Sequence, residues 1–193
     1  MTKYAVVLFL IFPVIISCKK KKKEPEKKFI PVVSLIKAQV AHVDTSLYPI
    51  MRIAYIDSLH SDTVFIPREE FSAAAKDFLD IPDLSDKKIA RRFKEETMYD
   101  GTINRVVITY IPVSPADEEI QKQELLVTPN SVSGDKVNSI IINRVISNRD
   151  SLLQRNMLWQ MDKYFQVTTI RQLPGKPETI TTVKVTWNEG NDQ

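Results

Sequence analysis

Apolar residues recur at helical spacing in two stretches near the amino terminus. Residues 32–44 follow Pro31, which suits the first turn of a helix, and their apolar side chains fall on one face. A second helix is predicted to begin at Pro67, with two glutamates in its first turn, and to end at Pro82. The positions expected to face a core are Val32, Leu35, Ile36, Val40, Val43 and Leu47, then Phe71, Ala74, Ala75, Phe78 and Leu79.

Elsewhere polarity alternates with a period of two, which is typical of strands. Residues 50–57 and 63–66 are predicted as a hairpin around a polar loop, and residues 83–88 as a connection. After that, short turns separate seven further segments, and one-sided alternation is clear in some of them, such as Val183, Val185 and Trp187. These predicted strands are Ala90–Tyr99, Thr102–Pro112, Gln121–Thr128, Lys136–Ser147, Leu152–Gln160, Tyr164–Leu173 and Thr179–Trp187.

Together the elements predict an α+β fold: one antiparallel meander sheet of about seven to nine strands, with two helices near the N-terminus packed on one face. We expect a single domain over residues 31–187 and a flexible tail over 188–193. The chain has 193 residues, 43% of them apolar and 26% charged, which excludes a disordered or polytopic membrane protein. Ile103–Val106 repeats as Ile142–Val145, either through duplication of a hairpin or by chance, and chance is favoured.

The first residues have the form of a secretory signal, because a nearly unbroken apolar run from Tyr4 to Ile16 follows Lys3. At about 1.5 Å per residue, a helix of this length reaches only about 20 Å, short of the roughly 30 Å hydrocarbon core. If the segment stayed as a membrane anchor, the lysines that follow it would favour keeping the rest of the chain in the cytoplasm. We therefore expect residues 1–17 to be cleaved, with a retained anchor as the alternative.

Cys18 is the only cysteine, and it ends this run in the sequence Ile15-Ile16-Ser17-Cys18. These four residues resemble a bacterial lipobox, although Ile15 stands where Leu is commoner. The resemblance implies that the Cys18 thiol is diacylglycerylated, that the signal is cut before it, and that the new amino group is acylated. A lone thiol in an exported chain cannot form an internal disulfide, which agrees with lipidation; an unmodified buried cysteine is the alternative.

Residues 18–30 are predicted to form a lysine-rich tether that begins with Lys19, Lys20, Lys21, Lys22 and Lys23. The lysines serve either as a solvated spacer or as a contact to anionic headgroups, worth about 1 kcal/mol each near such a surface. Residues 29–193 carry 19 basic and 22 acidic side chains, a formal charge of −3. The overall charge of +3 therefore comes from the tether, and it does not indicate nucleic-acid binding.

The layout of signal, cysteine, tether and domain resembles that of uncharacterised envelope lipoproteins of Bacteroidota-type bacteria. Lys19 is not the Asp that keeps some lipoproteins at the inner membrane, and no acidic cluster of the kind used for surface exposure follows Cys18. The resemblance therefore implies an anchor in the outer membrane, with the domain on its periplasmic face.

Few residues suggest catalytic chemistry. The four glycines stand singly, so no phosphate-binding loop is present, and two histidines are too few for an all-histidine zinc site. His42 beside Asp44, and His60 beside Asp57 and Asp62, could each bind a cation or move a proton, but exposed polar side chains are the favoured interpretation.

Three groups of adjacent acidic residues are also present: Glu69-Glu70, Glu95-Glu96 and Asp117-Glu118-Glu119. Neighbours in sequence point in different directions on a strand or a helix, so none of these groups forms an acid and base pair unaided. We predict that the chain is not an enzyme and holds no metal, cofactor or catalytic residue.

Trp159, Trp187 and Phe165 either line an apolar groove between sheet and helices or simply pack in a core. The leading hypothesis is a non-catalytic module that binds or assembles with another envelope protein. The alternative is a carrier whose groove holds a hydrophobic ligand, either a lipid or a peptide. The third and weakest hypothesis is a hydrolase whose active site follows none of the familiar motifs.

Overall fold

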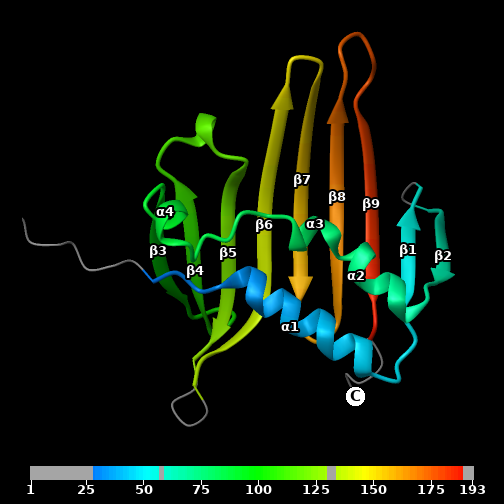
Figure 1. The fold of residues 1–193 in the computed structure, drawn as a ribbon, viewed down its shortest axis with the longest axis horizontal. Helices are drawn as coiled ribbons and strands as arrows, with labels where there is room; N and C mark the ends of the chain where they lie inside the picture. Colours follow the sequence, from blue (N-terminus) through cyan, green and yellow to red (C-terminus); the bar gives the residue numbers. More distant parts are fainter. Residues whose placement is uncertain (1–27, 57–58, 130–133, 189–193) are drawn as a thin grey trace, which may run out of the picture.

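A nine-stranded antiparallel sheet forms one layer of the molecule, and short helices lie on one of its faces (Figure 1). The computed structural model describes residues 28–56, 59–129 and 134–188. The predicted signal peptide, Cys18, the tether lysines Lys19–Lys23 and the tail after residue 188 lie outside the described residues. The two faces of the sheet are named here the helix-covered face and the open face.

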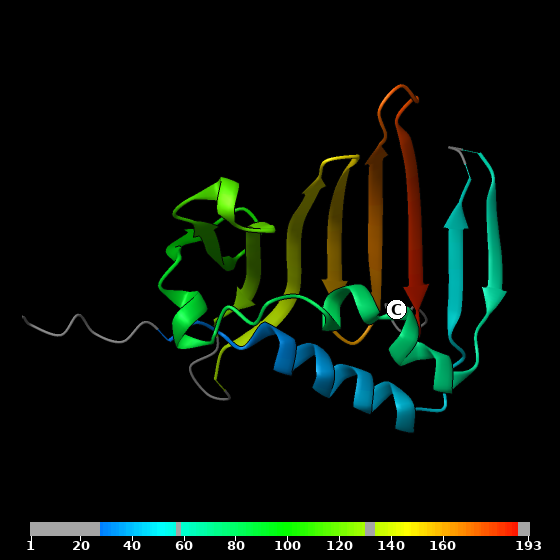
Figure 2. The same ribbon diagram turned by 45° about the horizontal axis from the view of Figure 1, so that its top comes forward.

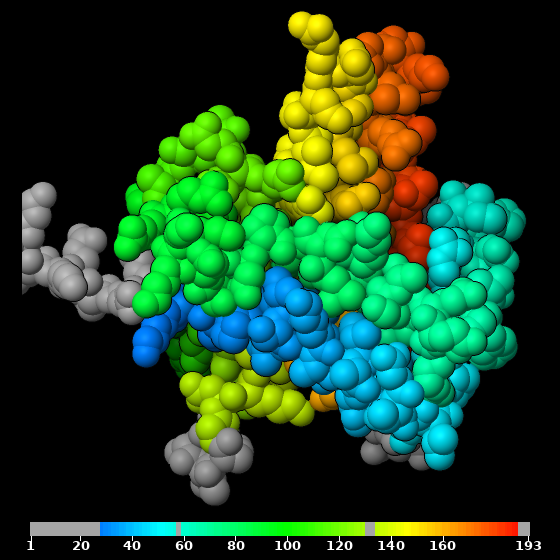
Figure 3. Space-filling view, viewed as in Figure 1, coloured from blue at the N-terminus to red at the C-terminus, as the bar shows by residue number. Residues whose placement is uncertain are grey.

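The helical segments all precede the third strand. They are α1 Val32–Thr45, the 3₁₀ turn η1 Arg68–Glu70, α2 Phe71–Ala74, α3 Lys76–Leu79 and α4 Lys87–Ala90. A further 3₁₀ turn, η2 Pro115–Asp117, follows the fourth strand. Figure 2 shows α1, α2 and α3 on the same side of the sheet, and Figure 3 shows the far ends of β6 to β9 projecting beyond these helices.

The strands are β1 Met51–Tyr55, β2 Ser61–Phe65, β3 Phe93–Asp100, β4 Arg105–Pro112, β5 Ile120–Thr128, β6 Lys136–Asn148, β7 Ser151–Gln160, β8 Tyr164–Gln172 and β9 Thr179–Thr186. Their order across the sheet is β2-β1-β9-β8-β7-β6-β5-β4-β3, and every neighbouring pair is antiparallel. The predicted α+β meander is therefore confirmed from β3 to β9.

The first hairpin takes a place that local patterning does not predict. β1 pairs with β9, as in Met51 opposite Thr186, although the two strands are eight apart in sequence order. The segment between β2 and β3 makes this possible, because it crosses the helix-covered face from one edge to the other (Figures 1 and 2). As a result β2 and β3 are the two edge strands.

Helix α1 confirms the helix predicted over residues 32–44. Its buried side chains are Val32, Val33, Ile36, Val40 and Val43. Leu47, predicted to face the core, is 97% exposed, because the helix ends at Thr45 and Ser46 is already extended. The Arg68 guanidinium donates to the carbonyl oxygens of Val43 and Tyr48 and to Ser46 Oγ, so it satisfies groups that the helix end leaves free.

The continuous helix predicted between Pro67 and Pro82 is wrong. This segment is divided into η1, α2 and α3, and the backbone leaves helical geometry at Ala75. Phe71, Ala75 and Phe78 are nevertheless buried, as the stripe predicted. Tertiary packing prevails here because separate turns can present the two phenylalanines to the sheet while the chain crosses several strands.

The residues of α4 were predicted to belong partly to a connection, over residues 83–88, and partly to a strand that begins at Ala90. The Asp86 carboxylate accepts a hydrogen bond from the Lys88 N–H at 2.7 Å, and this N-cap starts one helical turn. The predicted strand start at Ala90 is therefore wrong, since β3 begins at Phe93.

The repeated tetrapeptide has no common structural role. Ile103 and Asn104 belong to the turn before β4, where Asn104 has a φ of 52°, whereas Ile142 and Asn143 lie in the middle of β6. Chance repetition explains the sequence similarity, because the two copies occupy different local conformations.

The open face carries polar side chains that pair with one another across the strands. Asn143 Nδ2 donates to Asn156 Oδ1 at 2.7 Å, and the hydroxyls of Thr168 and Thr182 lie 3.0 Å apart. Lys122 forms an ion pair with Glu124 on the same face. Cross-strand pairing of this kind suits a solvated surface, as the one-sided alternation predicted.

Candidate functional site

The three aromatic residues predicted as a possible groove lie in the core. Trp159, Phe165 and Trp187 are 0%, 1% and 3% exposed. Trp159 and Phe165 occupy opposite positions on β7 and β8, and their rings stack with centroids 5.1 Å apart. Phe71 contacts Trp187 and Phe78 contacts Trp159 at centroid distances of 5.0 and 5.1 Å. The groove prediction is therefore corrected: side chains from α2 and α3 fill the space over these rings.

This packing leaves some polar atoms inside. Trp159 Nε1 and both polar atoms of the Gln123 side chain are buried with no hydrogen-bond partner within the described part of the chain. Gln123 lies between Tyr110 and Ile142 on the helix-covered face. Such atoms cost free energy, and neither Gln123 nor Trp159 lines any of three hollows at the surface of the described residues.

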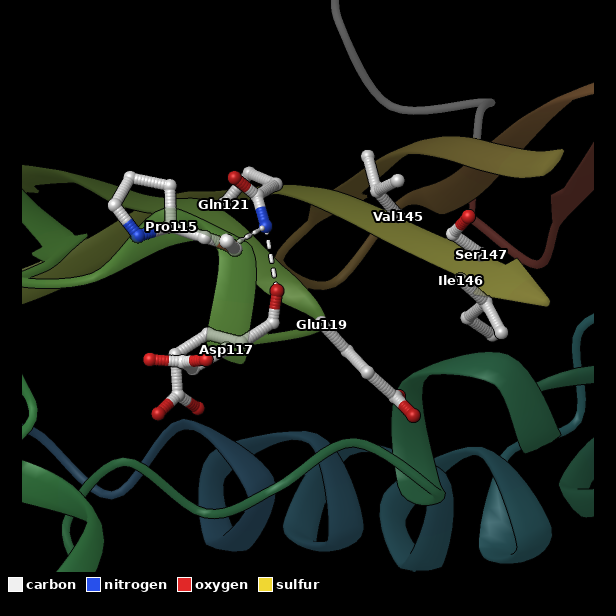
Figure 4. Close-up of a pocket in the computed structure, with 9 residues that line it drawn as sticks. Pro115, Asp117, Glu119, Gln121, Val145, Ile146 and Ser147 are labelled. Carbon is white, nitrogen blue, oxygen red and sulfur yellow. Dashed lines mark hydrogen bonds between the residues drawn. The ribbon is translucent and has the colours of Figure 1, made fainter. Parts of the chain in front are cut away.

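A hollow of about 480 Å³ lies between the η2 loop and β6. Figure 4 shows Pro115 and Gln121 on one side and Val145, Ile146 and Ser147 on the other. Gln121 Nε2 donates to the Pro115 carbonyl oxygen at 2.9 Å, which braces the loop.

Two of the three carboxylates beside this hollow have cationic partners. Glu118 pairs with Arg92 at 2.7 Å, and Glu119 pairs with Arg144 at 2.6 Å, while Asp117 is exposed. On the strand next to β6, Arg155 lies opposite Arg144 and pairs with Asp77 at 2.8 Å. Glu118 and Glu119 of the predicted acidic group thus pair with arginines that hold the loop and the sheet together.

The structure does not bring the two histidines into a metal site. His42 lies exposed in the last turn of α1, and His60 lies exposed just before β2. In the part of the chain that the structure describes, no group of three or more His, Cys, Asp or Glu side chains could hold a metal ion. Asp57, the predicted partner of His60, lies outside the described residues. Glu69, Glu70, Glu95 and Glu96 are exposed.

The point at which the tether joins the domain is fixed beside β3. The Phe29 ring is buried and stacks on Tyr110 of β4 with centroids 4.2 Å apart. The Ile30 N–H donates to the Tyr110 hydroxyl oxygen at 3.1 Å. Burial raises the pKa of Tyr110, and Glu95 raises it further, while the Ile30 hydrogen bond acts in the opposite direction. These contacts form what is named here the tether root.

The opposite edge of the sheet exposes a concentration of apolar side chains. Seven large apolar residues between positions 47 and 65 are at least 40% exposed: Leu47, Tyr48, Tyr55, Ile56, Leu59, Val64 and Phe65. Five of them, Tyr55, Ile56, Leu59, Val64 and Phe65, belong to the hairpin of β1 and β2, and they are named here the β2 edge patch. Phe65 is 72% exposed and Leu59 is 89% exposed.

The β2 edge patch surrounds the edge strand. Phe65 lies opposite Met51 and points to the open face, whereas Val64 lies opposite Arg52 and points to the other. Sequence reasoning found the hairpin but missed the patch, since an alternating hairpin looks the same at an edge and in the middle of a sheet. The sequence signal that could have indicated the patch is the presence of apolar residues at adjacent positions, on both faces of a short strand.

Comparison of the chain with models of known protein families, with curated proteins and with solved structures finds no match. Among the described residues, no helix has the length and apolarity needed to cross a membrane.

Proposed function

We propose that this protein is a lipid-anchored component of the cell envelope that binds another envelope protein without catalysing a reaction. The observation that carries the proposal is the β2 edge patch, which gathers exposed apolar side chains on one hairpin. Soluble domains scatter such side chains singly, so five of them on one short hairpin mark it as a candidate interaction surface.

The patch lies far from the tether root. Eight interstrand spacings of about 4.8 Å separate β2 from β3, or roughly 38 Å across the sheet. The ten residues from Lys19 to Lys28 can reach at most about 36 Å when fully extended. A lipid on Cys18 would therefore lie within about 36 Å of the tether root, on the other side of the sheet from the β2 edge patch, and the patch would stay accessible to a partner.

The charged groups support binding rather than catalysis. Glu118 and Glu119 at the hollow beside β6 are paired with Arg92 and Arg144, and Asp77 is paired with Arg155. These ion pairs tie the η2 loop and α3 to neighbouring parts of the fold, which is a structural role.

The anchor is tested by mass analysis of the protein extracted from intact membranes. We expect Cys18 to carry lipid, residues 1–17 to be absent, and the protein to be recovered with outer-membrane vesicles. A Cys18→Ser variant should lose membrane attachment. An unmodified Cys18 with the first 17 residues retained would contradict the anchor.

The docking surface is tested by placing a photo-cross-linking amino acid at Phe65 in native cells. The matched control is Met98 on β3, which is 61% exposed at the other edge. We expect one dominant cross-linked protein from position 65 and a much weaker product from position 98. Equal products from both positions, or none from position 65, would overturn the proposal.

The alternative function, carriage of a lipid or peptide, receives less support from the packing. Phe71 and Phe78 fill the space over Trp159 and Phe165, so a ligand there would require the helices to move away from the sheet. Extraction of protein purified from native cells tests this idea. A stoichiometric co-purified lipid would favour a carrier over a protein-binding module.

A further inference from the structure

The edge strand β2 has main-chain groups with no neighbour in the described sheet. Its contacts with β1 include hydrogen bonds from the Ile66 N–H to the Ile50 carbonyl and from the Ile56 N–H to the His60 carbonyl, each 3.0 Å long. Bonded and non-bonded pairs alternate in an antiparallel ladder, so the even-numbered residues of β2 direct their main chain toward β1. Ser61, Thr63 and Phe65 therefore direct three N–H donors and three carbonyl acceptors outward.

The two edges differ in what protects them. β3 carries Lys94, Glu95, Glu96 and Asp100 among its eight residues, and such charges oppose pairing with a further strand. β2 carries Asp62 as its one charged residue, and Val64 and Phe65 beside it are apolar. The edge without protective charges is the same edge that carries the exposed apolar patch.

We infer that the partner adds a strand to β2, through main-chain hydrogen bonds to Ser61, Thr63 and Phe65. This inference rests on the proposed function, because it states how the β2 edge patch binds. The added segment is extended, and apolar side chains at every second position pack beside Phe65 and Tyr55 on the open face.

The segment is also basic. Asp62 of β2, with Glu69 and Glu70 of η1, are exposed acidic side chains at this end of the sheet. Two arginines lie near these groups: Arg68 already donates to three oxygen atoms at the end of α1, and Arg52 lies on β1 opposite Val64, so the acidic side chains outnumber them. A basic partner therefore gains attraction, whereas a second copy of this chain would bring Asp62 and both glutamates against the same charges.

The inference is tested in the full-length lipidated protein by removing one main-chain N–H donor of β2. The probe is a ten-residue peptide of alternating Val and Lys, and the control peptide alternates Val and Glu. Thr63→Pro removes an outward N–H and leaves the bonds to β1 in place, while Thr63→Val keeps the N–H. We expect Thr63→Pro to weaken binding of the Val-Lys peptide about tenfold, as loss of one hydrogen bond predicts, and Thr63→Val to leave it unchanged.

Hydrogen exchange in the unsubstituted protein gives a second measurement that does not depend on the folding of a variant. We expect the Val-Lys peptide to slow exchange over residues 61–65 and the Val-Glu peptide to leave it unchanged. Binding without slower exchange there, or equal binding to the Thr63→Pro variant, would overturn strand addition.

Other outcomes separate this inference from the proposed function. If Tyr55→Ala abolishes the product cross-linked from position 65 while Thr63→Pro leaves it intact, the patch binds through side chains and strand addition is wrong. If the protein sediments as a dimer that Thr63→Pro dissociates, the occupant is a second copy and the basic partner is wrong. If position 65 gives no cross-linked partner at all, the proposed function itself fails.

Discussion

The two edge strands of the described sheet both have unpaired main-chain groups, but their surroundings protect these groups to different degrees. At β3 the chain protects the edge with charged side chains, with α4 just before the strand and with the Phe29 ring packed on neighbouring Tyr110. At β2 there is a short strand of five exposed residues with one charge. Three apolar residues are also exposed near β3, namely Met98, Tyr99 and Ile103, but charged residues flank them.

This difference shows that one edge is protected within the fold and that the other is not. An unprotected apolar edge is a liability for a soluble domain, because it can pair with other chains. Phe29 and Ile30 pack beside the β3 edge, on the other side of the sheet from β2. The proposed function therefore assigns the partner to the β2 edge.

The largest contrast is expected between a phenylalanine on each edge strand. Phe93 of β3 is fully buried, so Phe93→Ala should lower the free energy of unfolding by about 3–5 kcal/mol through lost packing and a cavity. Phe65 of β2 is 72% exposed, so Phe65→Ala should change the free energy of unfolding by less than about 0.5 kcal/mol. Urea unfolding of both variants measures the difference, and equal effects would contradict the assignment of core and surface at the two edges.

A smaller loss is expected at the corner that holds the β2 edge in place. Arg68→Met removes the guanidinium that joins Val43, Ser46 and Tyr48 and should cost about 1–3 kcal/mol, since three hydrogen bonds from a charged donor are lost. Arg91→Met, at an exposed arginine beside β3, is the matched control and should change stability by less than about 0.5 kcal/mol. Thermal unfolding compares the two, and a similar loss in both would refute a specific role for Arg68.

The tether root should show a loss of about 1 kcal/mol when its hydroxyl is removed. Tyr110→Phe keeps the ring that stacks on Phe29 but leaves the Ile30 N–H without its acceptor. Limited proteolysis should then cut faster around residues 28–30. Tyr55→Phe, at the β2 edge, should alter neither stability nor proteolysis, and unchanged cleavage in Tyr110→Phe would show that the hydroxyl does not fix the root.

Alkaline pH should weaken the β3 edge selectively. The pKa of Tyr110 in the folded protein is raised above its usual 10.0, chiefly by burial, so the folded state holds this proton more tightly than the unfolded state. Its contribution is fully present below pH 10 and is lost as the pH rises from there through the raised pKa. Between pH 8 and 11.5, the free energy of unfolding should fall more steeply with pH for the native protein than for Tyr110→Phe. Parallel curves would contradict this assignment.

The smallest effect on stability, but a clear effect on association, is expected from a charge on the bare edge. Phe65→Lys should change the free energy of unfolding by less than about 0.5 kcal/mol and weaken binding of the Val-Lys peptide, because it removes an apolar contact and adds a like charge. Met98→Lys at the protected edge should leave peptide binding unchanged. Titration of both variants with the peptide measures the effect, and an equal reduction would mean that the edges are not distinguished by their protection.

Much of the fold follows from local patterning. The alternation in Tyr164–Gln172 and Thr179–Thr186 predicts strands that match the structure to within one residue, because period-two polarity depends only on which side of the strand faces the core. Helix α1 is predicted equally well until its end, where Leu47 continues the apolar pattern after the chain has left the helix.

The candidate site is a different case. Trp159 and Phe165 were predicted to lie either in a groove or in a core, and their sequence positions cannot distinguish the two, because the covering rings of Phe71 and Phe78 come from about eighty residues earlier. The β2 edge patch was not predicted, since its exposure depends on which strand lies next to β2.

The sequence by itself determines the segments of this protein: an expected signal and lipidated cysteine, a lysine-rich tether, an early helix and a run of hairpins. These features depend on residues close together in the chain, where polarity and turn chemistry act directly. Only the tertiary structure decides that β1 pairs with β9, that the aromatic rings form a core, and that β2 is left as an unprotected edge. Each of these depends on contacts between distant segments, and such contacts form only when the chain between β2 and β3 crosses the sheet.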